Sequence, residues 1–173
     1  MKQDNKGFTL VEAIIVIALI GIIGGFFIGG MGYIPNSAAK SLASSIKSSI
    51  GETRIKTMGK QETVLFLYRD SSDGKYYKQL IYRQGSVVKA DEAEMIGKHY
   101  PVVTYYYNDG SGDTSAVLDS TGLLIGFDRT NGKEANITMS GYGTSKMCNR
   151  IVVTGGGATC DITIVPETGK VIY

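Results

Sequence analysis

One acidic residue interrupts a long apolar stretch near the N-terminus, and it is the first candidate for chemistry in this sequence. The stretch runs from Phe8 to Ile34, and Glu12 is its one charged residue. An acidic residue inside such a segment costs about 2.5–3.5 kcal/mol on membrane-insertion scales, and a buried carboxylate needs a partner. A residue retained at that cost usually marks function. We therefore predict that Glu12 has a functional role.

The remaining residue types that could support catalysis or metal binding are sparse. The chain has a single histidine, His99, which excludes a multi-histidine metal site. Asp109, Ser111 and Asp113 alternate within a glycine-containing loop, but the Gly and Glu that complete an EF-hand loop are missing. We interpret His99 as structural and the loop as a flexible turn. No catalytic residue, metal site or cofactor is predicted, and the absence of a Walker lysine motif excludes an assembly motor.

The two cysteines, Cys148 and Cys160, are too few for a four-cysteine zinc site and enough for one disulfide. If the domain is exported, a disulfide between them is expected, and closing such a loop would stabilise the fold by about 3 kcal/mol. The alternative is two free thiols. A hairpin centred on the triple glycine 155–157 would not place the two residues directly opposite each other, so both alternatives stay open.

Length and charge set further limits. The 173 residues suffice for one domain and an accessory segment, and 43% hydrophobic with 20% charged residues excludes wholesale disorder. A formal net charge of +2 does not require a nucleic-acid partner. A weaker signal comes from four basic residues in the last third of the chain that could contact DNA phosphates: Lys133, Lys146, Arg150 and Lys170.

The N-terminal stretch allows three interpretations. Residues 13–34 are uncharged, and their 22 positions exceed the roughly 20 residues that cross a bilayer core. A cleaved signal peptide is one interpretation, with a small-residue site at Ser37–Ala39, although its apolar region would be unusually long. A plain membrane anchor is the second, and it leaves Glu12 unexplained.

The third interpretation rests on the order Lys6-Gly7-Phe8-Thr9-Leu10-Val11-Glu12. This order resembles the type III signal of type IV pilins and pseudopilins. The resemblance implies that prepilin peptidase removes the leader after Gly7 and that the new N-terminal Phe8 is methylated. It also implies that Glu12 pairs with the α-amino group of Phe8, on the same or a neighbouring subunit, and so sets the register of assembly.

The same stretch carries a pattern suited to helix packing. Gly21, Gly25 and Gly29 recur every four residues and share one helix face. Small residues at this spacing let helices approach closely in an apolar medium, although glycine is also simply common in membrane helices. We predict that this face packs against neighbouring helices.

The resemblance implies a leader at 1–7. The hydrophobic pattern predicts a helix at 8–60 with a transmembrane half at 8–34, and then a β-rich domain at 61–173. The apolar stripe of Leu42, Ile46 and Ile50 predicts that the second half of the helix, ending near Thr57, packs on a sheet. Short β-rich runs separated by turn signals predict an antiparallel sheet or sandwich. The runs are 63–68, 76–83, 102–107, 123–127, 135–139, 150–153, 162–165 and 171–173. The fold class is α+β.

Within that class the sequence is similar to the GspH/FimT type of pseudopilins and minor pilins. The similarity covers Leu42–Phe66, where a helix with Arg54 near its end leads to a Val-rich strand, then Leu124–Phe127 with Gly132. Shorter matches follow at Asn149–Val153 and Thr168–Val171. The resemblance implies a long helix packed on a β domain.

We expect a non-enzymatic structural subunit of a type IV pilus or type II secretion filament that primes, caps or decorates it. Its partners would be other pilins or pseudopilins, prepilin peptidase, the inner-membrane assembly platform and lipid. It would be a single-pass cytoplasmic membrane protein with its globular domain outside, and then part of a periplasmic or extracellular filament. Alternatives are a DNA-binding minor pilin and an anchored binding domain that does not polymerise.

Overall fold

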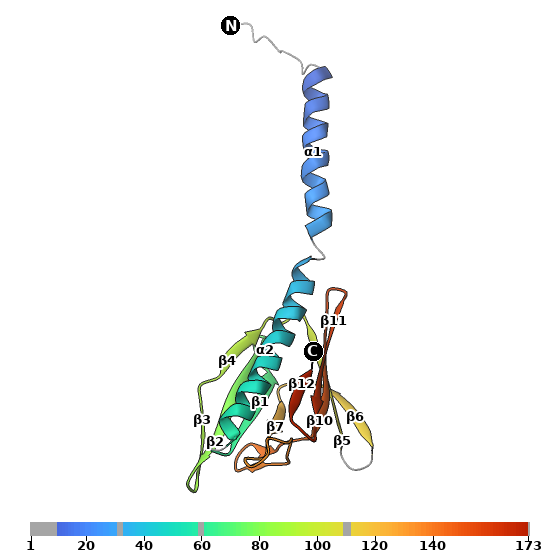
Figure 1. Cartoon of the computed structure of the whole chain (residues 1–173). Coiled ribbons are helices and arrows are strands. Elements are labelled where there is room, and N and C mark those ends of the chain that lie inside the picture. The colour runs from blue at the N-terminus through green and yellow to red at the C-terminus, as the bar shows by residue number, and fades with distance from the viewer. Residues whose placement is uncertain (1–9, 31–32, 59–60, 109–111, 173) are drawn as a thin grey trace, which may run out of the picture.

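The computed structural model describes residues 10–30, 33–58, 61–108 and 112–172, with side chains omitted at 24–30 and 33–36. Helix α1 spans Leu10–Gly30 and helix α2 spans Tyr33–Thr57. In Figure 1, α1 extends away from the β-rich part and α2 lies against it. The described strands after α2 form antiparallel sheets, joined by turns and loops. The predicted α+β class, with an N-terminal helix and antiparallel sheets, is confirmed.

Helix α2 forms because its apolar residues recur at helical spacing and can be buried together. Leu42, Ile46 and Ile50 are fully buried, as the stripe predicted. Arg54 and Lys56 lie in the last turn, where their positive charges interact favourably with the negative end of the helix dipole. The helix ends at Thr57, where the Thr57 hydroxyl donates hydrogen bonds to the carbonyls of Thr53 and Thr63. These bonds join the helix end to the first strand.

The first sheet has the strand order β3-β2-β1-β7, with β4 also paired to β2. Its strands are β1 (Thr63–Arg69), β2 (Tyr76–Gln84), β3 (Val87–Ala90), β4 (Glu94–Gly97) and β7 (Leu123–Gly126). The second sheet has the order β12-β11-β10-β5-β6. Its strands are β5 (Val102–Asn108), β6 (Asp113–Val117), β10 (Cys148–Gly155), β11 (Ala158–Val165) and β12 (Lys170–Ile172).

The main core lies between α2 and the two sheets. It joins the α2 stripe to alternate residues of β1, β5, β10 and β11, among them Leu65, Val103, Ile151 and Ile162. A second, smaller cluster lies on the other side of the first sheet and includes Val64, Ile81 and Met139. Strand β1 therefore has apolar residues on both faces, and its two faces serve different clusters.

Segment 134–147 covers the second cluster and contains the short hairpin of β8 (Thr138–Met139) and β9 (Gly143–Thr144). The predicted strand 135–139 is wrong except at its last two residues. The Ser145 hydroxyl donates to the Ala135 carbonyl and accepts from the Ile137 amide. Hydrogen bonds to this side chain therefore take the place of backbone hydrogen bonds between strands there. Strands β3, β4, β6 and β9 were not predicted.

Candidate assembly surface

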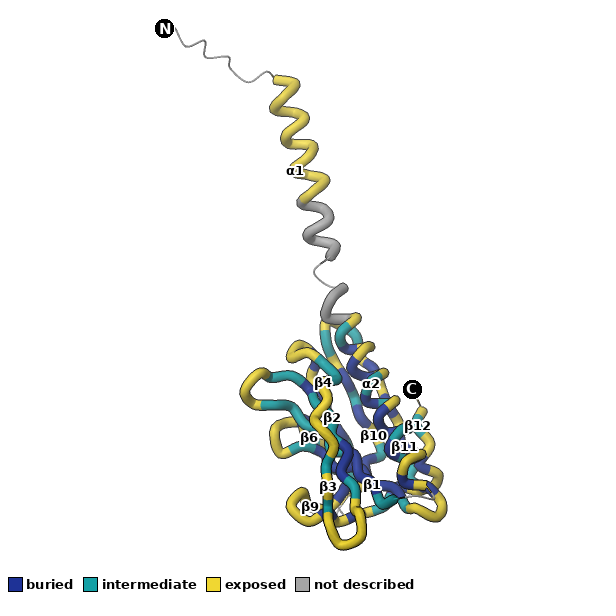
Figure 2. The backbone as a smooth tube through the Cα atoms, turned by 90° about the vertical axis from the view of Figure 1, so that its left-hand side faces the viewer, coloured by how far each residue is buried: buried dark blue, intermediate teal, exposed yellow. Residues whose placement is uncertain are grey.

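The largest unpartnered apolar surface of the described chain is the side of α1. From Leu10 to Ile23 its ten large apolar side chains are each 45–76% exposed. In Figure 2 this part of the helix is exposed along its whole length, whereas α2 alternates between buried and exposed. Contiguous apolar surface of this size usually marks contact with protein or lipid. Helix α1 is therefore the candidate assembly surface.

Glu12 lies in the first turn of this helix. The N-terminal end of a helix carries partial positive charge, which favours an acidic residue there. Gly7 and Phe8, the predicted processing residues, and the predicted leader 1–7 lie outside the described residues. The predicted pairing of Glu12 with the α-amino group of Phe8 thus stays a prediction.

The predicted glycine face falls within α1. Gly21, Gly25 and Gly29 are all helical. At Gly21 an added methyl group would meet no atom within 4 Å, so this position is open within the subunit. The surroundings of the other two glycines are outside the described side chains. Packing of this face against another helix stays a prediction.

The four predicted phosphate-contacting residues do not form one uniform basic surface. Arg150 on β10 makes an ion pair with Asp161 on β11 through two of its nitrogens and lies over the Tyr106 ring. Lys146 lies 4.0 Å from the centre of the Tyr107 ring. Lys133 and Lys170 are exposed on the loop after β7 and on β12.

The predicted disulfide between Cys148 and Cys160 is wrong. Both thiols are free and buried. The β10–β11 hairpin places Cys160 opposite Val153, five residues along β10 from Cys148. At about 3.4 Å per residue this is about 17 Å, far beyond the roughly 7 Å between Cα atoms that a disulfide allows. The hairpin turn at Gly156 and Gly157, both at positive φ, sets this register.

A buried carboxyl group that the sequence did not reveal lies on the loop after β7, against the start of β10. Glu134 is only 5% exposed, and its Oε1 accepts a hydrogen bond from the Cys148 amide, while its Oε2 is buried without a partner among the described residues. Its own amide donates to the Pro166 carbonyl at 3.1 Å. Burial raises the pKa of Glu134 from 4.5 to about 8.

The Cys148 thiol is affected by the same environment. Burial, and secondarily the neighbouring Glu134, raise the pKa of Cys148 to about 12. A thiol held neutral in this way is a poor nucleophile, because the thiolate is the reactive form. The pair is therefore suited to holding the loop against β10, and it does not resemble an activated cysteine site.

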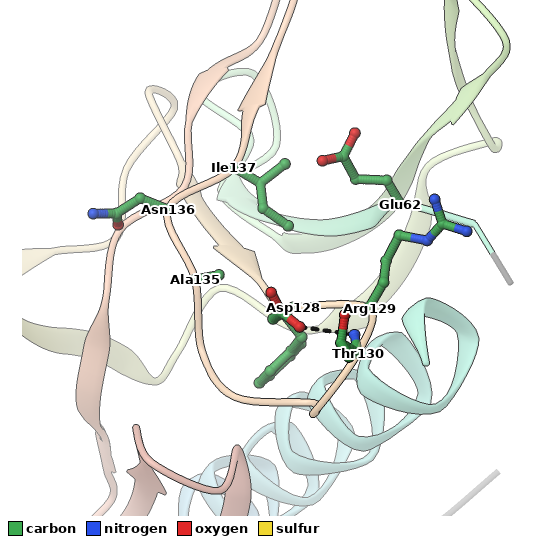
Figure 3. Close-up of a pocket in the computed structure, with 8 residues that line it drawn as sticks. Glu62, Asp128, Arg129, Thr130, Ala135, Asn136 and Ile137 are labelled. Atoms are coloured by element: carbon green, nitrogen blue, oxygen red, sulfur yellow. Dashed lines mark hydrogen bonds between the residues drawn. The ribbon is translucent and has the colours of Figure 1, made fainter. Parts of the chain in front are cut away.

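A polar pocket of about 570 Å³ lies near the end of α2, between the start of β1 and the loop after β7. Figure 3 shows side chains that line it. Its carboxylates are already engaged: Asp128 accepts the Thr130 amide at 2.7 Å, and Glu62 pairs with Arg83 at 3.2 Å. In the same view the Asn136 side chain points away from Glu62. The pocket offers no set of free, converging groups of the kind that catalysis requires.

Comparison with known families agrees with the N-terminal sequence pattern. Residues 2–28 match the family described as the prokaryotic N-terminal methylation motif. This match supports a type IV pilin-like protein that assembles with other pilins and is processed by prepilin peptidase. It suggests a structural rather than an enzymatic protein. Comparisons with curated proteins and with solved structures gave no match.

The motif also suggests attachment to a membrane and a place in a surface or periplasmic filament. Within the described ranges, no helix combines the length and the apolar character needed to cross a membrane.

Proposed function

We propose that this protein is a minor pilin or pseudopilin of the GspH/FimT type, a structural subunit that primes, caps or decorates a type IV pilus or type II secretion filament. The observation that carries the proposal is the methylation motif at residues 2–28, which overlaps helix α1, where the ten described large apolar side chains are 45–76% exposed. A helix exposing so much apolar surface requires other helices or lipid around it.

In this proposal the leader 1–7 is removed after Gly7 and the new N-terminal Phe8 is methylated. Residues 8–34 hold the subunit in the cytoplasmic membrane before assembly and then form the centre of the filament. Support for this comes from the uncharged run 13–34, which is long enough to span a bilayer. Residues 61–173 form the domain that the filament presents outside the membrane.

In this proposal Glu12 sets the position of each subunit along its neighbours in the filament. In the correct register this carboxylate would pair with the α-amino group of Phe8. A subunit displaced along its neighbours would lose that ion pair, and the loss of one partner of an ion pair in apolar surroundings is strongly unfavourable. The glycine face of Gly21, Gly25 and Gly29 lets the neighbouring helices come close enough for this pairing.

Substitution at Glu12 tests the proposal. Glu12→Ala should leave the chain in the membrane fraction but sharply reduce its recovery in sheared filaments, measured by quantitative immunoblotting. Glu92→Ala is the matched control, because Glu92 is an exposed acidic residue on the loop before β4. Equal recovery of Glu12→Ala and wild type would instead favour an anchored binding domain that does not polymerise.

The DNA-binding alternative receives less support. Neutralisation of Arg150 by Asp161 removes one of the four cations proposed to contact phosphate. Lys146 is drawn toward Tyr107 rather than outward. Binding to duplex DNA that weakens steeply with salt would revive this alternative, because the slope reports the number of phosphates neutralised. No binding at low salt would exclude it.

A further inference from the structure

A sequence motif that the assembly role does not use lies on segment 134–147, which covers the second cluster. Residues 136–138 read Asn-Ile-Thr, and this fits the acceptor pattern for attaching a glycan to asparagine, Asn-x-Ser/Thr with x other than Pro. The pattern occurs once in the sequence. Because a pattern this short also arises by chance, its placement in the structure has to decide whether it can serve as an acceptor.

The motif divides its side chains between the interior and solvent. Ile137 is only 8% exposed and packs in the second cluster with Val64 and Ile81. Asn136 and Thr138 are both exposed, which is the alternation expected of an extended chain. The two side chains that define an acceptor site are therefore presented together to solvent, and the residue that the pattern leaves free is the buried one.

The side-chain amide of Asn136 is not engaged in the fold. It makes no hydrogen bond to another residue within the described ranges, and Figure 3 shows it directed away from Glu62. Asn136 also lines two pockets, the one of about 570 Å³ described above and one of about 840 Å³ that includes Tyr107 and Lys146. Open space of this size leaves room for a first sugar at the amide nitrogen.

The Thr138 hydroxyl is held at the surface by a neighbour across the short hairpin. It lies 2.8 Å from the Thr144 hydroxyl, and either oxygen can donate. Thr138 and Thr144 are direct partners of β8 and β9, and both residues are exposed. This hydroxyl matters because the acceptor pattern requires Ser or Thr two residues after the asparagine.

The motif lies far from the assembly helix. In Figure 1 the segment that carries it is drawn in orange at the end of the β-rich part away from α1. Figure 2 shows strand β9 of the same segment at that end as well. A bulky, solvated glycan there would leave the exposed side chains of α1 uncovered, so the modification is compatible with assembly.

We propose that Asn136 is an N-glycosylation site, modified from an oligosaccharide carried on a polyprenyl pyrophosphate. The Asn136 Nδ2 atom forms a bond to the anomeric carbon of the first sugar, and the bond from that carbon to the pyrophosphate breaks. Polyprenyl pyrophosphate leaves, and the amide nitrogen gives up one proton to a base of the transferase. The inference rests on the proposed function in one respect, because the β-rich domain has to reach the outer side of the membrane.

The test is mass spectrometry of the full chain purified from its native membrane. Trypsin cleavage after Lys133 and Lys146 gives the peptide 134–146, in which Asn136 is the only asparagine. We expect this peptide to carry the added mass of a glycan, with fragment ions that place it on Asn136. Asn136→Gln and Thr138→Ala should each abolish the added mass, whereas Thr138→Ser should retain it.

Ser140→Ala is the matched control, because it removes an exposed hydroxyl from the same peptide and leaves the motif intact. This variant should keep the glycan. An unmodified wild-type peptide would overturn the proposal, as would a glycan attached to serine or threonine, or one that persists in Thr138→Ala. The N-terminal peptide of the same digest reports processing at Phe8, so failure of the proposed function is recorded separately from failure of this inference.

Discussion

The two helices follow each other in sequence and differ in where their stabilising contacts come from. Helix α2 buries Leu42, Ile46 and Ile50 against two sheets of its own subunit. Between Leu10 and Ile23, where its side chains are described, helix α1 buries none of its large apolar side chains in that way. An amphipathic helix is completed by its own domain, whereas a helix that is apolar all round requires neighbours or lipid. Contacts within the subunit thus bury the apolar side chains of α2, whereas the described apolar side chains of α1 require other helices or lipid to cover them.

The largest expected effect concerns a buried glutamate of the β-rich domain, Glu134, compared with Glu12 on α1. Because the pKa of Glu134 is about 8 in the folded state and about 4.5 when exposed, the folded state keeps a proton that the unfolded state loses. The contribution of Glu134 to stability should be greatest below pH 4.5, fall as pH rises to 8, and then level off, by up to about 5 kcal/mol in all. Glu134→Gln should remove most of this slope in urea unfolding, whereas Glu12→Gln should leave it unchanged. An identical slope in Glu134→Gln would contradict the assignment.

A matched pair of isoleucines tests the comparison directly. Ile46→Ala should lower the free energy of unfolding by roughly 3 kcal/mol, because it leaves a cavity beneath α2. Ile17→Ala removes the same atoms from an exposed position on α1 and should change it by less than about 0.5 kcal/mol. Urea unfolding in mild detergent, followed by tyrosine fluorescence, measures both. Comparable losses would mean that α1 is also held by contacts within the subunit.

Two glycines test how much the close contact at the C-terminal end of α2 contributes to stability. Gly169 has a positive φ, and an added methyl group would collide with the Gly132 carbonyl and crowd Arg54, which donates to that carbonyl. Gly85 has a similar φ but open space around it. We expect Gly169→Ala to cost about 2 kcal/mol or more, and Gly85→Ala about 1 kcal/mol. Thermal unfolding compares them, and equal losses would exclude a special role for the close contact.

The smallest effect is expected at the Arg150–Asp161 pair. Its members are about half exposed, so the pair should contribute less than about 1 kcal/mol. A double-mutant cycle with Arg150→Ala and Asp161→Ala measures the coupling, which should shrink further at high salt. A coupling of several kcal/mol would show that the outer face of the second sheet is a structural element rather than a solvated surface.

The spacing of apolar residues along the sequence was enough to predict α2, β1, β2 and β10. The stripe through Ile46 and the alternation in β1 each repeat at the period of their element. Strands β3 and β4 are short and lie at the edge of the sheet, and Lys89 and Glu94 interrupt their apolar runs. Their pairing with β2 comes from the assembled sheet, which local pattern does not encode.

Prediction of the candidate sites met the same limit, because local sequence patterns do not encode contacts between distant residues. The disulfide prediction failed because the distance between the cysteines depends on a hairpin register that two glycines at positive φ determine. Glu134 stands between Lys133 and Ala135 and is indistinguishable in sequence from a surface residue, so nothing local signalled its burial. The N-terminal signal was readable because its meaning lies in the order of consecutive residues, which a processing enzyme reads directly.

The central claim is that α1 belongs to a processed filament subunit. Intact-mass and N-terminal peptide analysis of the protein from its native membrane tests this most directly. The account predicts a mature chain that begins at Phe8, with a methyl group on its α-amino nitrogen. A chain that still begins at Met1, or one that begins near Ala39, would contradict it.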